Sequence, residues 1–137
     1  MLENDAQSFL MDYLNNLGGF VCKIELSGKP LNGAGGKIIK LIPFKNKYYR
    51  KAMSDCLFFY RSNFYAFEFK KIDEHEKIKR QLHRFETMTV EMLPEYLHRA
   101  KDQYDFIEEI KKQGGHGGFV STLKDLKDII DNGHTKN

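Results

Sequence analysis

Two acidic residues and one lysine lie within aromatic segments near the middle of the chain, where apolar residues predominate. Asp55 comes just before the run CLFFY, Glu68 lies within FYAFEF, and Lys70 follows two residues later. Side chains alternate between the two faces of a strand, so Glu68 and Lys70 are expected on the same face. A short hairpin joining the two aromatic runs would bring Asp55 beside Glu68 on that face. The sequence therefore predicts two carboxylates and one ammonium group close to one another.

Such a group of side chains is suited to metal-assisted hydrolysis of a phosphodiester. Two carboxylates held together repel each other, and burial strengthens the repulsion. Mg²⁺ relieves this conflict because it prefers hard oxygen ligands, usually one or two carboxylates with waters and substrate phosphates. A lysine beside the ion can orient water or stabilise charge on a reacting phosphate. The same spacing also fits an ordinary ion pair on the solvated face of a hairpin, and the pattern alone leaves both interpretations open.

Hydrophobic periodicity and turn residues indicate which elements position these side chains. The N-terminal half is expected to form one helix and then four strands, over residues 3–17, 20–26, 37–44, 54–60 and 64–70. Gly18-Gly19 should end the helix, because glycine enters the left-handed region at low cost. The last two strands should form the aromatic hairpin, joined by Arg61-Ser62-Asn63.

The C-terminal half is expected to be mainly helical. It should contain an amphipathic helix and a loop within 72–92, a helix from Pro94 to about Gln113, a strand over 117–120, and a last helix that Ser121 caps and Gly133 follows. The order of elements predicts an α/β (α+β) fold with a mixed sheet flanked by helices. We expect one domain over residues 1–137, with a frayed tail at 134–137.

Composition narrows the classes of protein to which the chain can belong. Hydrophobic residues make up 41% and charged residues 30% of 137 residues, which excludes a wholly disordered or fibrous chain. No apolar run approaches the ~18 residues of a membrane span, and the N-terminal MLENDAQ lacks the basic start of a secretory signal. Cys22 and Cys56 show no CxxC spacing and are expected to be buried thiols. These features predict a cytoplasmic protein without a membrane partner.

Charge and histidine placement give weaker indications. The net charge of +3 is too small to identify a nucleic-acid partner by itself. Residues 37–51 are rich in lysine and arginine and contain no acid, which fits either a phosphate-binding segment or a solvated loop. The candidate phosphate contacts are Lys45, Lys47, Arg50, Lys51 and Lys71. The five histidines lack zinc-site spacing with the cysteines and are expected on the surface.

Several further motifs occur in a consistent order along the chain. The first expected helix carries Glu3 and Gln7 ahead of a YL…GG sequence, and Gln103 lies in DQYDFI. Glu68-Phe69-Lys70 forms an E-x-K motif, and the chain closes with GGHGGFVSTLKDLKDII. Over nearly its whole length, the chain resembles the VRR-NUC branch of the PD-(D/E)XK nuclease superfamily, which includes proteins similar to Holliday-junction resolvases. A resemblance to junction resolvases of the RecU type is the alternative.

Two features depart from that family pattern. The usual Gly-x-x-Asp is replaced by KAMSD, which ends at Asp55. The segment from the E-x-K motif to Gln103 is longer than in compact members, so residues 71–93 are expected to be a family-variable insertion that forms a wall, a lid or a dimer contact.

The resemblance implies a role for each matching residue. Asp55 and Glu68 are expected to ligate Mg²⁺ or Mn²⁺, with the backbone carbonyl of Phe69 and the side chain of Glu3 as further ligands. Lys70 is expected to position the attacking water or stabilise charge on the phosphate. The implied catalytic set is therefore Asp55, Glu68, Lys70, Gln103 and Glu3. Glu3 also fits an ordinary acidic residue in the first turn of a helix, where it interacts favourably with the helix dipole. A buried Gln103 also fits a structural hydrogen bond.

The implied activity is that of an Mg²⁺-dependent endodeoxyribonuclease acting on branched DNA or Holliday junctions as a homodimer. A bacterial or phage source fits the small stand-alone members of this family. The alternative function is a nucleic-acid-binding module that has the same fold but does not cut DNA.

Overall fold

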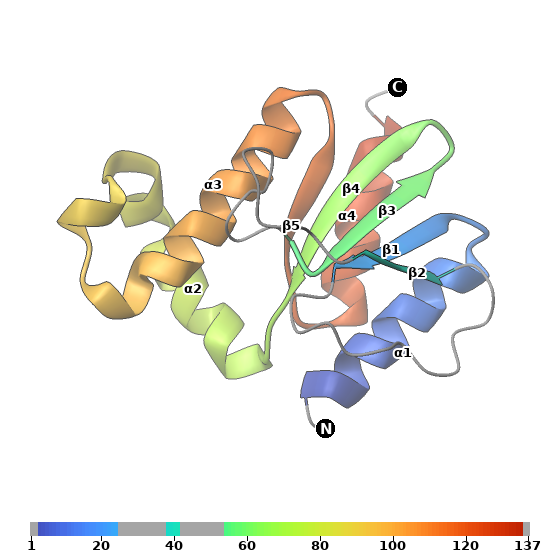
Figure 1. The fold of residues 1–137 in the computed structure, drawn as a ribbon, viewed down its shortest axis with the longest axis horizontal. Helices are drawn as coiled ribbons and strands as arrows, with labels where there is room; N and C mark the ends of the chain where they lie inside the picture. Colours follow the sequence, from blue (N-terminus) through green and yellow to red (C-terminus); the bar gives the residue numbers. More distant parts are fainter. Residues whose placement is uncertain (1–2, 25–37, 42–53, 136–137) are drawn as a thin grey trace.

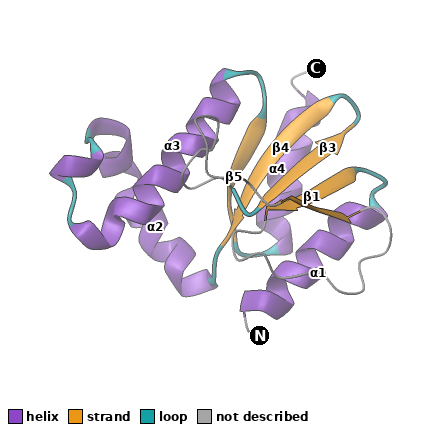
Figure 2. Ribbon diagram, viewed as in Figure 1, coloured by secondary structure: helices purple, strands orange, loops and turns teal. Residues whose placement is uncertain are grey.

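The computed structural model describes residues 3–24, 38–41 and 54–135, and these residues form a mixed five-stranded sheet with helices on both faces (Figures 1 and 2). The elements run in the order α1 (Glu3–Asn16), β1 (Phe20–Ile24), β2 (Ile38–Leu41), β3 (Cys56–Tyr60), β4 (Asn63–Phe69), α2 (Ile72–Thr87), η1 (Val90–Met92), η2 (Glu95–Leu97), α3 (His98–Lys112), β5 (His116–Val120) and α4 (Leu123–Thr135). The mixed α/β architecture agrees with the fold class expected from the sequence.

The strands lie in the order β2-β1-β3-β4-β5. β3 is antiparallel to both β1 and β4, whereas β5 is parallel to β4 and β2 is parallel to β1. Parallel neighbours need a long crossover connection, and α2 and α3 provide it between β4 and β5. The central hairpin therefore has a neighbouring strand on each side.

The main hydrophobic core lies between the sheet and the helices α1 and α4. Leu10 and Leu14 of α1 and Leu126 of α4 pack against Tyr65 and Phe67 of β4. Successive residues of a strand face opposite sides, so the intervening Ala66 and Glu68 face the other layer, where α3 lies. Figure 1 shows α3 and α2 on the opposite side of the sheet from α1.

The central hairpin closes with two residues rather than the expected three. Tyr60 pairs with Asn63, so Asn63 already belongs to β4. Arg61 and Ser62 form the turn with φ angles of 49° and 67°. A two-residue turn in the left-handed region matches the twist of the adjoining strands, which explains the shorter connection.

The segment between β4 and α3 forms a small second core. Ile78 and Phe85 of α2 pack with Leu93 and Leu97, and Phe119 of β5 packs against this group. The buried Lys101 of α3 donates to the carbonyl of Phe85 at 2.7 Å, near the C-terminal end of α2. A cation at that end of a helix interacts favourably with its dipole. Residues 71–93, which were predicted to be an insertion, thus pack onto α3.

The segment between α2 and α3 differs from the prediction in two ways. The loop after α2 contains the short helix η1, and the helix expected to start at Pro94 begins with a 3₁₀ turn, η2, before α3 starts at His98. The N-H of Leu97 bonds to the carbonyl of Pro94 at 3.0 Å, which is the tighter pattern of that turn.

The last helix, α4, also differs at both ends. Its N-cap is Thr122 rather than Ser121, because the Thr122 hydroxyl accepts the Asp125 N-H at 3.2 Å. Gly133 lies inside α4 rather than beyond it. A side chain there would place Cβ only 2.6 Å from the Tyr65 hydroxyl, so glycine permits the close approach of α4 to β4. The helix runs to Thr135, which covers part of the tail expected to fray.

Both cysteines are buried thiols without a disulfide, as the sequence predicts. The helices within residues 3–24 and 54–135 include none that is long and apolar enough to cross a bilayer.

Candidate active site

The pairing of β3 with β4 determines the position of the two acidic residues. The last paired residues are Cys56 and Phe67, and Asp55 and Glu68 are the next residue on each strand. Directly opposed residues of an antiparallel pair direct their side chains to the same face. Asp55 and Glu68 therefore lie side by side at the end of the hairpin far from its turn, in the arrangement expected from the sequence.

Glu68 is held in a buried position beneath α3. Its exposed fraction is 2%, and that of Gln103 on α3 is 3%. The side-chain amide of Gln103 donates to Glu68 Oε1 at 2.8 Å. Within the described part of the chain, Glu68 Oε2 is buried without a hydrogen-bond partner. Gln103 thus fixes one oxygen of the carboxylate, and the other has no donor unless one of the two neighbouring carboxyl groups is protonated.

Asp55 is half-buried and is oriented by the backbone of the neighbouring strand. Its Oδ2 accepts a hydrogen bond from the Phe69 N-H at 3.1 Å. This bond lies just beyond the last paired residues of β3 and β4, where the regular ladder has ended. The ring of Phe69 faces the main core, so Phe69 contributes its backbone rather than its side chain to this region.

Burial and the neighbouring carboxylate of Asp55 change the titration of Glu68. Burial raises the pKa of Glu68 to about 9, and the charge of Asp55 and a hydrogen bond with its carboxylate add to this effect. The charge of Lys70 and a bond from the Asp55 backbone N-H lower the pKa of Glu68 but do not outweigh the other causes. Glu68 therefore keeps a proton at neutral pH unless another positive charge takes its place.

Lys70 lies directly after β4 and is half-buried. Its backbone N-H donates to the Val120 carbonyl at 2.9 Å, which continues the pairing of β4 with β5 by one residue. The alternation of β4 places Lys70 on the same face as Glu68, consistent with the effect of its charge on the pKa of Glu68. The structure thus brings together Asp55, Glu68, Lys70 and Gln103.

The other predicted site residues are placed differently. Glu3 begins α1, but its side chain lies outside the described residues. The predicted phosphate contacts Lys45, Lys47, Arg50 and Lys51 also lie outside them. Lys71 is exposed at the N-cap of α2, next to Lys70.

Among the described side chains, two carboxylates belong to the candidate site, those of Asp55 and Glu68. No group of three or more histidine, cysteine, aspartate or glutamate residues that could hold a metal ion occurs in residues 3–24, 38–41 and 54–135. Mg²⁺ commonly takes one or two carboxylates from the protein and completes its shell with waters and substrate phosphate. The Asp55–Glu68 pair supplies the two carboxylates that such a Mg²⁺ site needs.

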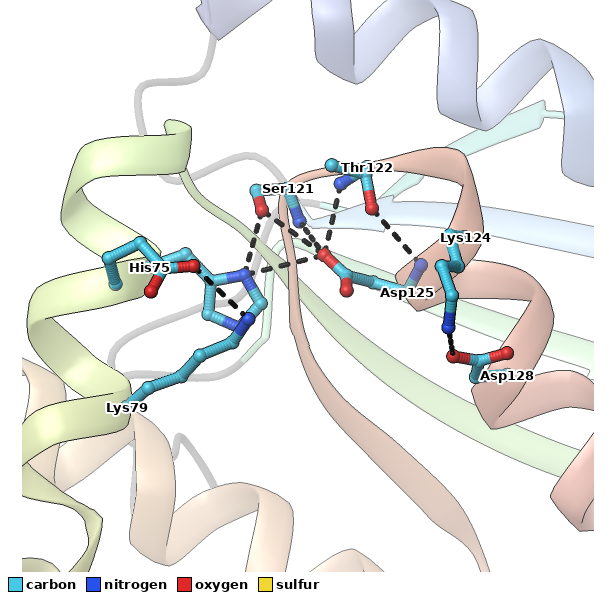
Figure 3. Close-up of polar contacts among 8 residues, drawn as sticks. His75, Lys79, Ser121, Thr122, Lys124, Asp125 and Asp128 are labelled. Carbon is cyan, nitrogen blue, oxygen red and sulfur yellow. Dashed lines mark hydrogen bonds and ion pairs between the residues drawn. The ribbon is translucent and has the colours of Figure 1, made fainter.

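A second polar cluster, made of His75, Ser121 and Asp125, connects the start of α2 with the start of α4 (Figure 3). The prediction that His75 lies on the surface was wrong, because its exposed fraction is only 6%. Its Nδ1 lies 2.8 Å from Ser121 Oγ and 3.4 Å from Asp125 Oδ2. The signal missed in the sequence is Thr122-x-x-Asp125, because a threonine followed three residues later by an acid often caps a helix.

The geometry of this cluster favours a structural role. Ser121 donates from both its N-H and its hydroxyl to Asp125 Oδ2, at 3.0 and 3.1 Å. Because the serine proton is directed to the aspartate, the Nδ1-H of a neutral His75 donates to Ser121 Oγ. Serine and aspartate meet the same ring nitrogen, whereas a Ser-His-Asp triad requires them on opposite nitrogens. The cluster therefore fixes α2 beside α4 instead of activating a nucleophile.

In comparisons with protein-family models, curated proteins and solved structures, the chain matches none of them.

Proposed function

We propose that this chain is a metal-dependent DNA endonuclease with the PD-(D/E)XK core, in which Asp55 and Glu68 hold Mg²⁺ or Mn²⁺ beside Lys70. The observation that carries the proposal is the face-to-face placement of two carboxylates at the end of the β3–β4 hairpin, with Gln103 fixing one of them. A structural ion pair on a solvated hairpin face needs neither a buried glutamate nor a second carboxylate opposite it. The burial of Glu68 therefore favours the metal-site interpretation of the sequence motif.

The donor set fits a hard divalent cation. Carboxylate oxygens are its preferred ligands, and the buried Glu68 Oε2 lacks a hydrogen-bond partner within the described residues. A cation would replace the shared proton and remove the repulsion between Asp55 and Glu68. The Phe69 carbonyl and the side chain of Glu3 are further ligands in this proposal, on the basis of the family resemblance alone.

Each residue of the site has a distinct task in the proposed reaction. The bound ion supplies positive charge that acidifies water and stabilises a phosphodiester under attack. Gln103 and the Phe69 N-H hold the two carboxylates in position. The Lys70 ammonium orients the attacking water or stabilises negative charge on the phosphate. Gln103 is a positioning residue in this scheme because its described contact is with Glu68 rather than with substrate.

The proposal extends to branched DNA as substrate and to a homodimer as the active form, following the family resemblance. A twofold dimer presents two equivalent sites, which suits the two symmetric strands of a four-way junction. Recognition of DNA shape depends mainly on backbone contacts, which basic residues such as Lys71 can make.

A cleavage assay with a labelled four-way junction and Mg²⁺ tests the function directly. We expect the natural protein to cut, and Asp55→Asn and Lys70→Ala to lose at least about 100-fold in rate, because each removes charge from the reacting centre. Asp73→Asn, which changes an exposed acid at the start of α2, is the matched control and should cut normally.

The other outcomes separate the alternatives. Equal cleavage by the natural protein and both site variants would reject this site. Junction binding by the natural protein without any cleavage would identify a non-catalytic binding module. A protein that neither binds nor cuts DNA would contradict both functions.

A further inference from the structure

Three phenylalanines form a row across the sheet at the turn end of the hairpin. Phe20 of β1 pairs with Phe59 of β3, which pairs with Phe64 of β4. Directly opposed residues share a face, so the three rings lie on one side of the sheet. The row Phe20-Phe59-Phe64 is called the aromatic row below.

The aromatic row shares its face with the candidate active site. Phe59 follows Asp55 by four residues, and Phe64 precedes Glu68 by four, so strand alternation places all four side chains on the same side. Four residues of strand span about 13 Å. That length corresponds to about four stacked nucleotides, at roughly 3.4 Å each along one strand.

Two rings of the aromatic row are unusually accessible. The exposed fractions of Phe20 and Phe59 are 44% and 45%. Their ring centroids are 6.1 Å apart with an angle of 53° between the planes. On this face α3 packs against β4 and β5, and Figure 2 shows it running beside that half of the sheet. The described helices thus leave Phe20 and Phe59 available to a ligand.

A hollow lies at the turn end of the hairpin, next to the aromatic row. Residues 59–64 line a hollow of about 330 Å³ at the end of the hairpin. Arg61 is exposed there, and its guanidinium carbon lies 5.1 Å from the centroid of the Tyr60 ring. Arg61 and Ser62 both adopt left-handed backbone conformations that glycine or asparagine would adopt at lower cost. Tyr60 faces the main core, on the opposite side of the sheet from Phe59, so the Arg61 guanidinium lies on the main-core side of the hairpin.

The size of the exposed aromatic surface distinguishes a nucleobase from a second copy of the chain. An aromatic side chain buries 150–250 Å² when fully covered, so two half-exposed rings offer roughly 150–200 Å². A stable protein interface needs about 800 Å² from each partner. One or two flat bases match the smaller area.

We propose that the aromatic row is a stacking platform for unpaired bases of the DNA strand whose backbone reaches the Asp55–Glu68 pair. The proposal rests on the endonuclease function proposed above and narrows its substrate class to DNA with a single-stranded stretch close to the cut. Base stacking on aromatic side chains tolerates any sequence, because every base presents a π-face. The platform therefore selects DNA by its unpaired state rather than by its sequence.

Binding of a labelled oligothymidylate of about 12 nucleotides, in chelator so that nothing is cleaved, tests the platform. We expect Phe59→Ala to weaken binding by at least about fivefold, the double change of Phe20 and Phe59 to alanine to weaken it further, and Phe59→Trp to restore it. Binding of a blunt duplex of the same length should change less than about twofold, because its bases are already stacked inside the helix.

Phe9→Ala, which removes an exposed phenylalanine on α1, is the matched control and should leave strand binding unchanged. Circular dichroism and the unfolding temperature show whether each variant keeps its fold. No binding of the strand by the natural protein, an equal loss on strand and duplex, or no effect of Phe59→Ala would overturn the platform. A changed oligomeric state of Phe59→Ala in sedimentation, with unaltered strand binding, would assign the row to a second copy instead.

The platform and the endonuclease function fail in different ways. Asp55→Asn should abolish cleavage without weakening oligothymidylate binding. Junction cleavage by the natural protein, combined with no effect of Phe59→Ala on strand binding, contradicts only the platform. Strand binding that depends on Phe59, without cleavage of any DNA, contradicts only the endonuclease.

Discussion

At the scale of single residues, the Asp55–Glu68 pair has the least favourable electrostatics of the described site. Glu68 is buried, faces a second carboxylate, and has one oxygen without a partner among the described residues. Lys70 compensates only part of this charge, because the pKa of Glu68 still rises to about 9. A protein that maintains such an arrangement loses stability unless a proton or a cation occupies it.

The raised pKa of Glu68 predicts a specific dependence of stability on pH. Between about pH 4.5 and 9 the folded pair keeps a proton that the unfolded chain releases, so the free energy of unfolding should fall as pH rises, by up to about 1.4 kcal/mol per unit. Glu68→Gln should remove most of this slope in metal-free buffer, as measured by urea unfolding at pH 5 and pH 8. Identical slopes for the natural protein and Glu68→Gln would contradict the coupling.

Added Mg²⁺ provides the complementary measurement. It should raise the unfolding temperature of the natural protein more at pH 8 than at pH 5, since protons compete with the cation for the carboxylates. Glu68→Gln should show little response at either pH.

Gln103 gives a second prediction at this scale. Its amide donates to Glu68 Oε1, so Gln103→Leu leaves that oxygen without its described partner and frees the carboxylate to rotate. Removal of such an orienting group typically weakens metal affinity about 10- to 100-fold. Calorimetric titration with Mn²⁺ should show this weakening, and Gln113→Leu, at the exposed end of α3, should bind normally. Equal affinity of Gln103→Leu and the natural protein would make the hydrogen bond purely structural.

At the scale of elements, the hairpin and the helices contribute to the site in different ways. The β3–β4 hairpin sets the spacing between the acids at one end and the aromatic row at the other. α3 covers Glu68 and supplies Gln103, while α2 packs onto α3 through its own small core. The segment between β4 and β5 therefore covers Glu68 through α3 and supports α3 through α2.

The packing of α2 beside α4 predicts an acid-sensitive connection. Burial lowers the pKa of His75, although Asp125 opposes this effect. Because the unfolded chain binds a proton near pH 6.5 more readily than the folded protein does, the contribution of His75 is present above that pH and is lost as pH falls below it. In the Glu68→Gln background, which lacks the opposite slope of Glu68, chemical unfolding between pH 7.5 and 5.5 should show this loss, and adding His75→Gln should flatten the curve. His83→Gln, at an exposed position on the same helix, is the control and should retain the curve.

At the scale of the whole molecule, the distribution of charge is expected to affect DNA affinity more than stability. The net charge of +3 is small, so nucleic-acid binding depends on where the basic residues gather. Within the described residues, Lys70 and Lys71 lie together at the junction of β4 and α2. The basic segment 37–51 is the other candidate, on the basis of its sequence.

Salt dependence tests which basic residues bind the phosphates. Neutralising Lys45, Lys47 and Arg50 together should flatten the plot of log affinity for junction DNA against log salt, because fewer counterions are released. The slope should change by about 0.9 for each phosphate that the variant no longer neutralises. Neutralising Lys111 and Lys112, at the end of α3, is a control that should leave the slope unaltered. An unchanged slope after the first substitution would place the DNA elsewhere.

The sequence alone determined the hairpin and the relative positions of Asp55, Glu68 and Lys70. These depend on local rules, namely the period of two in a strand and a short connection, which fix the face of each residue. The same rules placed both cysteines in apolar strands. The predicted ends of the last helix differed from the structure at Thr122 and Gly133. These ends depend on which hydroxyl reaches a backbone N-H and on how closely α4 approaches Tyr65.

Only the tertiary structure decided which distant groups complete these local arrangements. Gln103 is separated from Glu68 by 35 positions and His75 from Ser121 by 46. Those pairings depend on how α3 and α2 pack in the folded protein. The hydrophobic periodicity of a helix indicates which of its faces is buried but not which residues that face contacts. The aromatic row became visible for the same reason: the exposure of Phe20 and Phe59 depends on which half of the sheet α3 covers.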